Sequence, residues 1–149
     1  MEPSVSTQSA GVSAVLPAYN EVSSVVEAVE GVRNSLKDLG VPYEIIVVDD
    51  GSSDGTVEAV EKTGVKVHRH TGNRGYGAAV KTGVRLAKHP WILLMDADGS
   101  YPPQAVADLF AQRTVADMVV GARTKRGAKV PVARRPAKWI LGRLAEFLS

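Results

Sequence analysis

The sequence contains no cysteine and few aromatic residues. Its 149 residues include two Trp, two Phe and four Tyr, an aromatic content of 5%. The absence of cysteine excludes disulfides, thiolate zinc sites and cysteine nucleophiles, and it is compatible with a reducing compartment. The low aromatic content argues against the stacking surfaces that bind single-stranded nucleic acid.

Long apolar runs and targeting signals are also missing. The longest apolar run beside an expected strand, Trp91 to Met95, is far too short to cross a bilayer. Residues 1–11 are polar and rich in Ser and Thr, and they lack the apolar core of a secretory signal. We therefore expect a disordered tail over residues 1–11 and a cytoplasmic protein.

The composition is that of one soluble globular domain, with an uneven distribution of charge. Hydrophobic residues make up 44% of the chain and charged residues 23%. Residues 121–149 contain eight Lys or Arg and one acid, whereas the first 120 residues contain ten basic and fifteen acidic side chains. A basic section after an acidic body suggests an anionic partner such as a phosphate, a membrane surface or nucleic acid.

Short apolar runs alternate with segments of helical periodicity. The runs predict strands over residues 12–16, 44–48, 65–68, 91–95 and 118–121, the first of which we expect Pro17 to stop. The periodic segments predict helices over residues 22–39, 56–62, 78–88 and 103–113. This alternation indicates an α/β fold with a mostly parallel, doubly wound sheet and helices on both faces. Ligands of such folds bind outside the carboxyl ends of the strands.

Four acids follow the expected strands: Asp49, Asp50, Asp96 and Asp98. Each acid alone could simply cap the next helix. Four carboxylates at one sheet edge repel one another, and a cation or a hydrogen-bonding ligand would compensate them. The Asp-x-Asp pair places two hard oxygen ligands within reach of one Mg²⁺ or Mn²⁺ and leaves positions for diphosphate oxygens.

Other polar residues give weaker indications. Asp50 could accept hydrogen bonds from a base or a ribose hydroxyl, as acids do in other nucleotide sites. The glycine-rich loop 72–77 either offers backbone N–H groups to an anion or simply starts a helix. His68 and His70 could bind a metal, but without a nearby carboxylate pattern we expect them at the surface.

Together these motifs resemble those of family-2 glycosyltransferases of the GT-A type, especially dolichyl-phosphate and polyprenyl-phosphate sugar transferases and their bacterial relatives. Five pieces carry the resemblance, in the order and spacing of that family over roughly residues 12–125. They are PAYNE at 17–21, EIIVVDDGSSDGT at 44–56, GNRGYGAAVKTG at 72–83, MDADGSYPP at 95–103 and DMVVGAR at 117–123. Five ordered motifs are far more specific than any one of them.

The resemblance implies roles for individual residues. The nucleoside would be surrounded by Pro17, Tyr19, Glu21, Val48 and Asp50. The metal and the diphosphate would be held by Asp96, the backbone of Ala97 and Asp98, and Arg123 would reach the phosphates. Asp98 and Arg123 are thus the expected catalytic residues. Ser100 stands where relatives often have Gln, and because serine is a shorter, weaker ligand, we expect a water between Ser100 and the metal.

The implied reaction is transfer of a sugar, with inversion, from a UDP- or GDP-linked donor. A polyprenyl or dolichyl phosphate acceptor is already an anion and needs little help from a base, whereas a saccharide hydroxyl requires a carboxylate base. Only Glu146 could supply one after residue 124, which favours the lipid phosphate or a base that belongs to the missing acceptor half. A transferase acting on a saccharide hydroxyl and a catalytically incomplete nucleotide-sugar-binding module are the alternatives.

The resemblance divides the chain into the tail over residues 1–11, a nucleotide-sugar-binding glycosyltransferase domain over 12–125 and a basic segment with an amphipathic helix over 126–149. In the family the chain continues into acceptor-binding segments, so the fold is expected to be incomplete at the C-terminus, with residues 126–149 at the start of a missing acceptor half. The amphipathic segment suits peripheral contact with the cytoplasmic face of a membrane, but an ordinary helix with an absent packing partner explains it as well.

Three other functions fit less well. A phosphoacceptor receiver domain has its acidic pair after the first strand and a lysine after the fifth, whereas here the pair follows the second strand and Arg123 follows the fifth. A nucleotidyltransferase usually has a glycine-rich basic loop where this chain has PAYNE. Nucleic acid is not an expected partner, because no recognised reading element accompanies the basic segment.

Overall fold

A computed structural model of the protein describes residues 11–121. The expected N-terminal tail, Arg123 and the amphipathic segment lie outside the described residues, apart from Gly11 at the end of the tail. The fold described here is built by residues 11–119.

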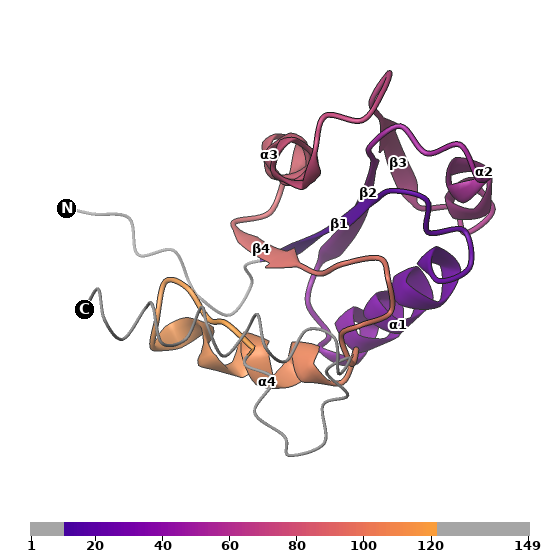
Figure 1. Ribbon diagram of the computed structural model, residues 1–149. Helices are drawn as coiled ribbons and strands as arrows, with labels where there is room; N and C mark the ends of the chain where they lie inside the picture. Colours follow the sequence, from indigo (N-terminus) through magenta and orange to yellow (C-terminus); the bar gives the residue numbers. More distant parts are fainter. Residues whose placement is uncertain (1–10, 122–149) are drawn as a thin grey trace, which may run out of the picture. The chain divides into compact units, whose positions relative to one another are not determined.

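Four parallel strands form the sheet: β1 (Val12–Ala18), β2 (Tyr43–Asp49), β3 (Lys66–Arg69) and β4 (Trp91–Leu94). Their order is β3-β2-β1-β4 (Figure 1). In register, Val12 of β1 pairs with Tyr43 of β2 and with Trp91 of β4. Every residue of β1 is buried, as are the last five of β2. Burial on both faces explains why these strands are continuous apolar runs rather than alternating ones.

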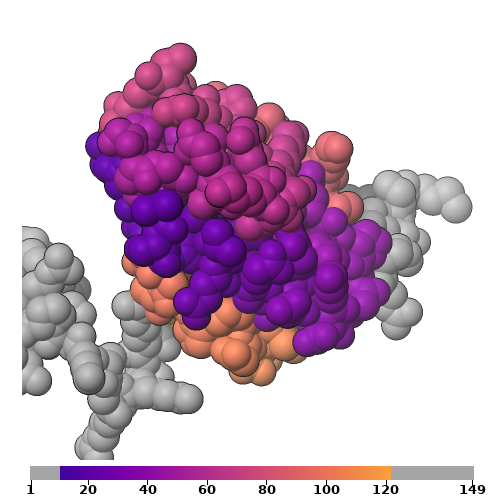
Figure 2. Space-filling model, turned by 90° about the vertical axis from the view of Figure 1, so that its right-hand side faces the viewer, coloured from indigo at the N-terminus to yellow at the C-terminus, as the bar shows by residue number. Residues whose placement is uncertain are grey.

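Helices cover both faces of the sheet: α1 (Val25–Asp38), α2 (Thr56–Glu61), α3 (Tyr76–Leu86) and α4 (Ala105–Ala111), the last followed by a 3₁₀ turn, η1 (Gln112–Thr114). Figure 1 shows α3 on one side of the sheet and α1, α2 and α4 on the other. From the side, the orange residues of α4 lie beside the indigo and violet residues of α1 (Figure 2). The predicted doubly wound α/β fold is therefore confirmed. No helix in the described part of the chain is long and apolar enough to span a bilayer.

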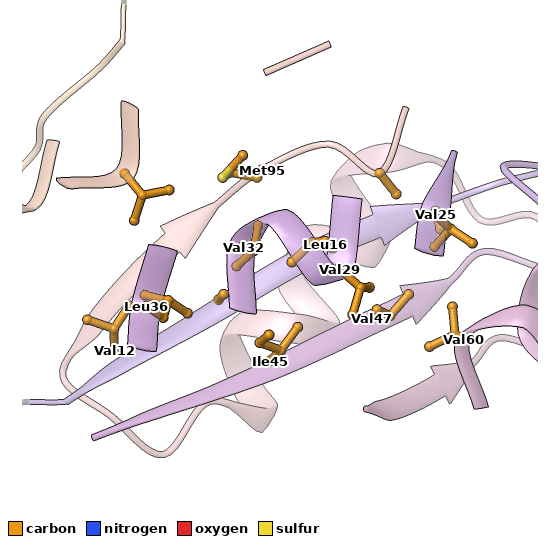
Figure 3. Packing of buried hydrophobic residues seen from close by; sticks show 14 residues of the cluster. Val12, Leu16, Val25, Val29, Val32, Leu36, Ile45, Val47, Val60 and Met95 are labelled. Atoms are coloured by element: carbon orange, nitrogen blue, oxygen red, sulfur yellow. The ribbon is translucent and has the colours of Figure 1, made fainter. Parts of the chain in front are cut away.

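The main core lies between the sheet and α1 (Figure 3). The apolar stripe of α1 places Val29 and Val32 against Leu16 and Val47, and none of these four side chains is exposed. Each buried side chain of this size contributes about 1.5–3 kcal/mol. A smaller cluster beneath α3 contains Ile46, Val48 and Ala79. The two clusters hold the sheet rigid where its carboxyl edge carries polar residues.

Strand β1 does not stop at Pro17 as predicted but continues to Ala18. Successive residues of β1 bond to opposite neighbours: Ala18 O accepts from Asp50 N, whereas Val15 O accepts from Met95 N. The backbone nitrogen of Pro17 points the same way as that of Val15, toward β4. Beside Pro17 this neighbour is missing, because β4 has already ended at Leu94. The missing N–H of Pro17 therefore costs no ladder hydrogen bond.

The expected fifth strand over residues 118–121 is wrong. The structure has no strand there, and the apolar residues Met118 and Val120 of this segment are 78% and 70% exposed. A run of β-forming residues becomes a strand only when a neighbouring strand accepts its hydrogen bonds. Within the described residues, β4 pairs only with β1.

Candidate functional site

A cleft of about 300 Å³ lies at the carboxyl edge of the sheet. It is formed by the residues after β1, β2 and β4 together with the loop and first turn of α3. Seven of the predicted site residues line it: Pro17, Tyr19, Glu21, Asp50, Asp96, Ala97 and Asp98. Residues 80 positions apart in the chain therefore meet at one edge, as the parallel topology requires.

One of the predicted site residues that the structure describes, Val48, does not line the cleft. Val48 is fully buried and packs with Ile46 and Ala79, the last of which does line the cleft. Its side chain thus supports the site from beneath, because it points to the α3 face of β2. Arg123 lies outside the described residues.

Asp50 holds the loop before α3. Its Oδ1 accepts a hydrogen bond from the Arg74 N–H at 2.9 Å, and its Oδ2 accepts one from the Gly75 N–H at 2.7 Å. The Nδ1 of His70 lies 2.7 Å from Oδ1. Burial raises the pKa of Asp50, but the hydrogen bonds from His70, Arg74 and Gly75 outweigh it and leave this pKa below its ordinary value. Asp50 is therefore an ionised anchor of the cleft wall at neutral pH.

Asp49 has a different position from the other three acids. It is fully buried, and its Oδ2 accepts hydrogen bonds from the N–H groups of Gly51 and Ser52. Arg69 approaches the same oxygen, with 3.6 Å between Nε and Oδ2. Asp49 does not line the cleft. Of the four aspartates that were expected to converge, only Asp50, Asp96 and Asp98 line the cleft. Asp49 instead shapes the turn after β2.

The loops after β1 and β2 are cross-linked by side chains. The N–H of Asn20 donates to Ser52 Oγ, and the Asn20 Oδ1 accepts from the Ser53 N–H. One step further, the N–H of Glu21 donates to Thr56 Oγ1 at 2.9 Å. Asn20 adopts the left-handed conformation (φ 56°) that these reciprocal bonds require. The cross-links fix the part of the cleft formed by Tyr19 and Glu21.

The Asp-x-Asp pair begins at Asp96, which Met95 separates from the end of β4, and is held by two further hydrogen bonds. The hydroxyl of Tyr76 donates to Asp96 Oδ1 at 2.9 Å, and the N–H of Ser100 donates to Asp98 Oδ1 at 2.8 Å. Partial burial and the bond to Asp96 raise the pKa of Tyr76 to about 12, so this hydroxyl stays a donor at neutral pH. Both carboxylates line the cleft and are pre-oriented there.

The donor set suits a hard divalent cation that is shared with a ligand. Within residues 11–121, no three His, Asp or Glu side chains gather closely enough to hold a metal by themselves. Mg²⁺ and similar ions are commonly bound by one or two carboxylates, with substrate phosphates and waters in the remaining positions. Asp96 and Asp98 supply such a pair at the mouth of the cleft.

His70 was wrongly expected at the surface. It is 4% exposed, and its two ring nitrogens lie 2.7 Å from Asp50 Oδ1 and 2.9 Å from Thr82 Oγ1. His68, by contrast, is exposed as expected. The signal for His70 was its place directly after a strand and beside the glycine-rich loop, but the carboxylate that pairs with it is 20 residues away.

Comparison with known proteins gives one family. The family model described as Glycosyl transferase family 2 matches residues 13–147. A dolichol-phosphate mannosyltransferase of Pyrococcus furiosus is 37% identical over 124 residues, which cover 80% of this chain and 35% of the relative. An undecaprenyl-phosphate 4-deoxy-4-formamido-L-arabinose transferase of Proteus mirabilis is 35% identical over 120 residues, covering 76% of this chain and 37% of the relative.

The fold has the same kind of neighbours among solved structures. A mannosyltransferase of Pyrobaculum calidifontis in complex with GDP-Man and Mn²⁺ superposes with a TM-score of 0.62 at 27% identity, covering 77% of this chain and 35% of that one. A mannosyl-3-phosphoglycerate synthase of Rubrobacter xylanophilus has the same TM-score at 25% identity, covering 70% and 36%. The chain thus spans little more than a third of the length of these relatives.

Proposed function

Because this chain belongs to glycosyltransferase family 2, we propose that its cleft binds a nucleotide diphosphate sugar and that the protein transfers the sugar to an acceptor with inversion. The observation that carries the proposal is the meeting of Asp50, Asp96 and Asp98 in one cleft with Pro17 and Tyr19. No single one of these strand ends could hold a nucleoside, a diphosphate and a cation. Together they offer an apolar wall, hydrogen-bond acceptors and metal ligands.

Asp96 and Asp98 are the proposed metal ligands, for Mg²⁺ or Mn²⁺. A divalent cation held there would neutralise charge that develops on the departing diphosphate. Tyr76 and the Ser100 N–H fix the two carboxylates, so they need little rearrangement when the donor binds. Arg123 is the proposed cationic contact to the phosphates.

The nucleoside is proposed to lie against Pro17, Tyr19 and Glu21, with the backbone of Ala97 near the diphosphate. UDP- and GDP-linked sugars are both candidates, and a mannosyltransferase neighbour in complex with GDP-Man supports the GDP-linked donor. Tyr19 is 48% exposed at this edge and offers a ring face to a base. The cross-linked loops hold this wall in place before a ligand arrives.

The proposed acceptor is a polyprenyl or dolichyl phosphate. The names of two relatives include dolichol phosphate and undecaprenyl phosphate. Such an acceptor is an anion near neutral pH and can attack the anomeric carbon with little help from a base. A lipid substrate also requires access to a membrane surface, so peripheral contact with its cytoplasmic face belongs to this proposal. The basic residues after position 121 have the right charge for anionic headgroups.

Calorimetric titration tests donor binding. We expect UDP or GDP to bind to the full chain in the presence of Mn²⁺ and to bind far more weakly with EDTA. Asp98→Ala should remove the gain in nucleotide affinity that Mn²⁺ gives. Asp117→Ala, at an exposed acid outside the cleft, should keep this gain. Binding that is equally strong in Asp98→Ala would contradict the assignment of the metal ligands.

Transfer is tested with radiolabelled UDP- and GDP-sugars and polyprenyl phosphate. Label in the lipid phase supports the lipid-phosphate transferase. Label on an added saccharide, with none in the lipid phase, identifies a transferase acting on hydroxyl groups. Metal-dependent binding with no product from either acceptor identifies a nucleotide-sugar-binding module.

A further inference from the structure

The strongest feature beyond the expected site is a chain of three side chains that starts at Asp50 and continues through His70 to Thr82; Asp50 and His70 are buried, and Thr82 is half-buried. His70 directly follows β3, and its own N–H donates to the Asp49 carbonyl at 2.9 Å. Its Nδ1 lies 2.7 Å from Asp50 Oδ1, and its Nε2 lies 2.9 Å from the Thr82 hydroxyl on α3. Both ring nitrogens are therefore used, and the ring is 4% exposed.

The chemistry of the partners fixes how the ring is bonded. The ionised Asp50 can only accept, so Nδ1 carries a hydrogen and donates it. In the neutral ring Nε2 then accepts the hydrogen of the Thr82 hydroxyl. His70 thus connects the end of β2 to the middle of α3 through two directed hydrogen bonds.

Asp50 in turn holds the N–H groups of Arg74 and Gly75, which lie next to Asn73 in the wall of the cleft. Gly75 has a positive φ of 90° and stands at the start of α3. The loop before it also packs closely on the turn after β2: a Cβ on Gly51 would come within 2.8 Å of the Asn73 nitrogen. The Asp50 carboxylate thus holds two N–H groups of loop 73–75, beside the packing on Gly51 and a bond from the Gly75 N–H to Asn73 Oδ1, and that carboxylate bonds to His70.

We propose that His70 is a positioning residue of the donor site: through Asp50 it holds loop 73–75 in the shape that receives the nucleotide diphosphate sugar. The inference rests on the proposed function for the nature of the ligand. The positioning itself is a property of the protein without ligand. His70 touches neither donor nor metal in this account, so its effect passes entirely through Asp50.

The first test measures amide hydrogen exchange in the full chain by NMR. In His70→Ala we expect the Arg74 and Gly75 amides to lose about tenfold in protection, while the buried amide of Ile46 keeps its rate. His70→Asn retains an N–H near the position of Nδ1 and should restore protection to within about threefold of wild type. Thr82→Val removes only the bond to Nε2 and should cause a smaller loss. Lys66→Ala, at an exposed residue of β3, should change nothing.

The second test measures binding of GDP and UDP with MnCl₂ to the same variants. The affinity of whichever nucleotide binds should fall about tenfold in His70→Ala and recover in His70→Asn.

Three results of the exchange experiment overturn the inference. The first is unchanged exchange at Arg74 and Gly75 in His70→Ala. The others are a loss of protection that His70→Asn fails to reverse and a loss that extends equally to Ile46. If His70→Ala does not fold, His70→Asn and Thr82→Val carry the comparison. If the exchange pattern is as expected but wild type binds neither nucleotide, the proposed function fails and the positioning of the loop stands.

Discussion

Asp50 contributes to stability through its charge, and this makes a pH-dependent prediction. The two carboxylate oxygens accept from the backbone N–H groups of Arg74 and Gly75 and bond to His70. Replacing Asp50 by Asn removes the negative charge and turns one of these oxygens into an NH₂ donor. We expect Asp50→Asn to lower the free energy of unfolding by about 1–3 kcal/mol at pH 7. Urea unfolding monitored by circular dichroism measures this difference.

The sign of the pH effect follows from the lowered pKa of Asp50, for which burial is outweighed by the three hydrogen bonds. The stabilisation is complete above the ordinary pKa of 3.8 and is lost as the pH falls through the lower pKa of the folded state. The gap between wild type and Asp50→Asn should therefore be constant from pH 7 to pH 5 and shrink below pH 3.8. Asp117→Asn, at an exposed acid, should show no such gap. A gap that widens in acid contradicts this account.

Individual residues differ in how well the sequence predicts them. Asp96 and Asp98 were predictable as cleft residues, because they follow a strand in a parallel sheet and are too polar to enter the core. Asp49 and His70 were not, because their hydrogen-bond partners decide which way each side chain turns. Asp49 turns its carboxylate to the N–H groups of Gly51 and Ser52, and His70 bonds to Asp50 and Thr82, which lie 20 and 12 residues away.

At the scale of elements, α3 packs on β1 closely enough to exclude a methyl group. A Cβ at Gly83 would overlap the Val15 side chain, which is fully buried in β1. We expect Gly83→Ala to destabilise the fold by about 1–3 kcal/mol through overpacking. Gly77→Ala in the same helix meets nothing within 4 Å and should be neutral or stabilising by up to about 1 kcal/mol. Chemical denaturation measures the free energy of unfolding of both variants. Equal changes in the two would contradict the packing argument.

The cross-link between the loops after β1 and β2 can be tested at Thr56, the first residue of α2. Its hydroxyl accepts from the Glu21 N–H and donates to Asp54, and the residue is fully buried. Thr56→Val keeps the shape but leaves the Glu21 N–H without its acceptor, which should cost about 1–3 kcal/mol of unfolding free energy. Thr71→Val, at an exposed threonine, serves as the control. If the two variants unfold alike, the hydroxyl does not hold the loops together.

Elements were predictable where hydrophobic pattern and tertiary context agree. The β2 run and the stripe of α1 satisfy both, and each element lies close to its expected bounds. The predictions for Pro17 and for residues 118–121 were wrong because both depend on the neighbouring strand. Beside Pro17, β4 has already ended, so the missing N–H of proline breaks no pairing and β1 continues. Residues 118–121 have no partner strand within the described chain, so they form no strand.

For the whole molecule, the separation of charge decides how an anionic ligand can bind. The first 120 residues contain five more acids than bases, and four of the acids, Glu21, Asp50, Asp96 and Asp98, line the cleft. A nucleotide diphosphate therefore approaches a site of its own sign, which repels it unless a cation intervenes. We therefore expect this protein to bind a nucleotide diphosphate only together with a divalent cation.

Thermal unfolding of the full chain tests this dependence. A nucleotide at about 100 times its Kd stabilises the native state by about 2.7 kcal/mol. In a chain of this size that raises Tm by about 5–11 °C. We expect such a shift with GDP or UDP only when Mn²⁺ is present, and we expect it to disappear in Asp98→Ala although the Tm without ligand stays close to wild type. Asp117→Ala should keep the full shift. A shift of equal size in EDTA would mean that the nucleotide overcomes the acidic field without a cation, and the carboxylates at the ends of β2 and β4 would then need another explanation.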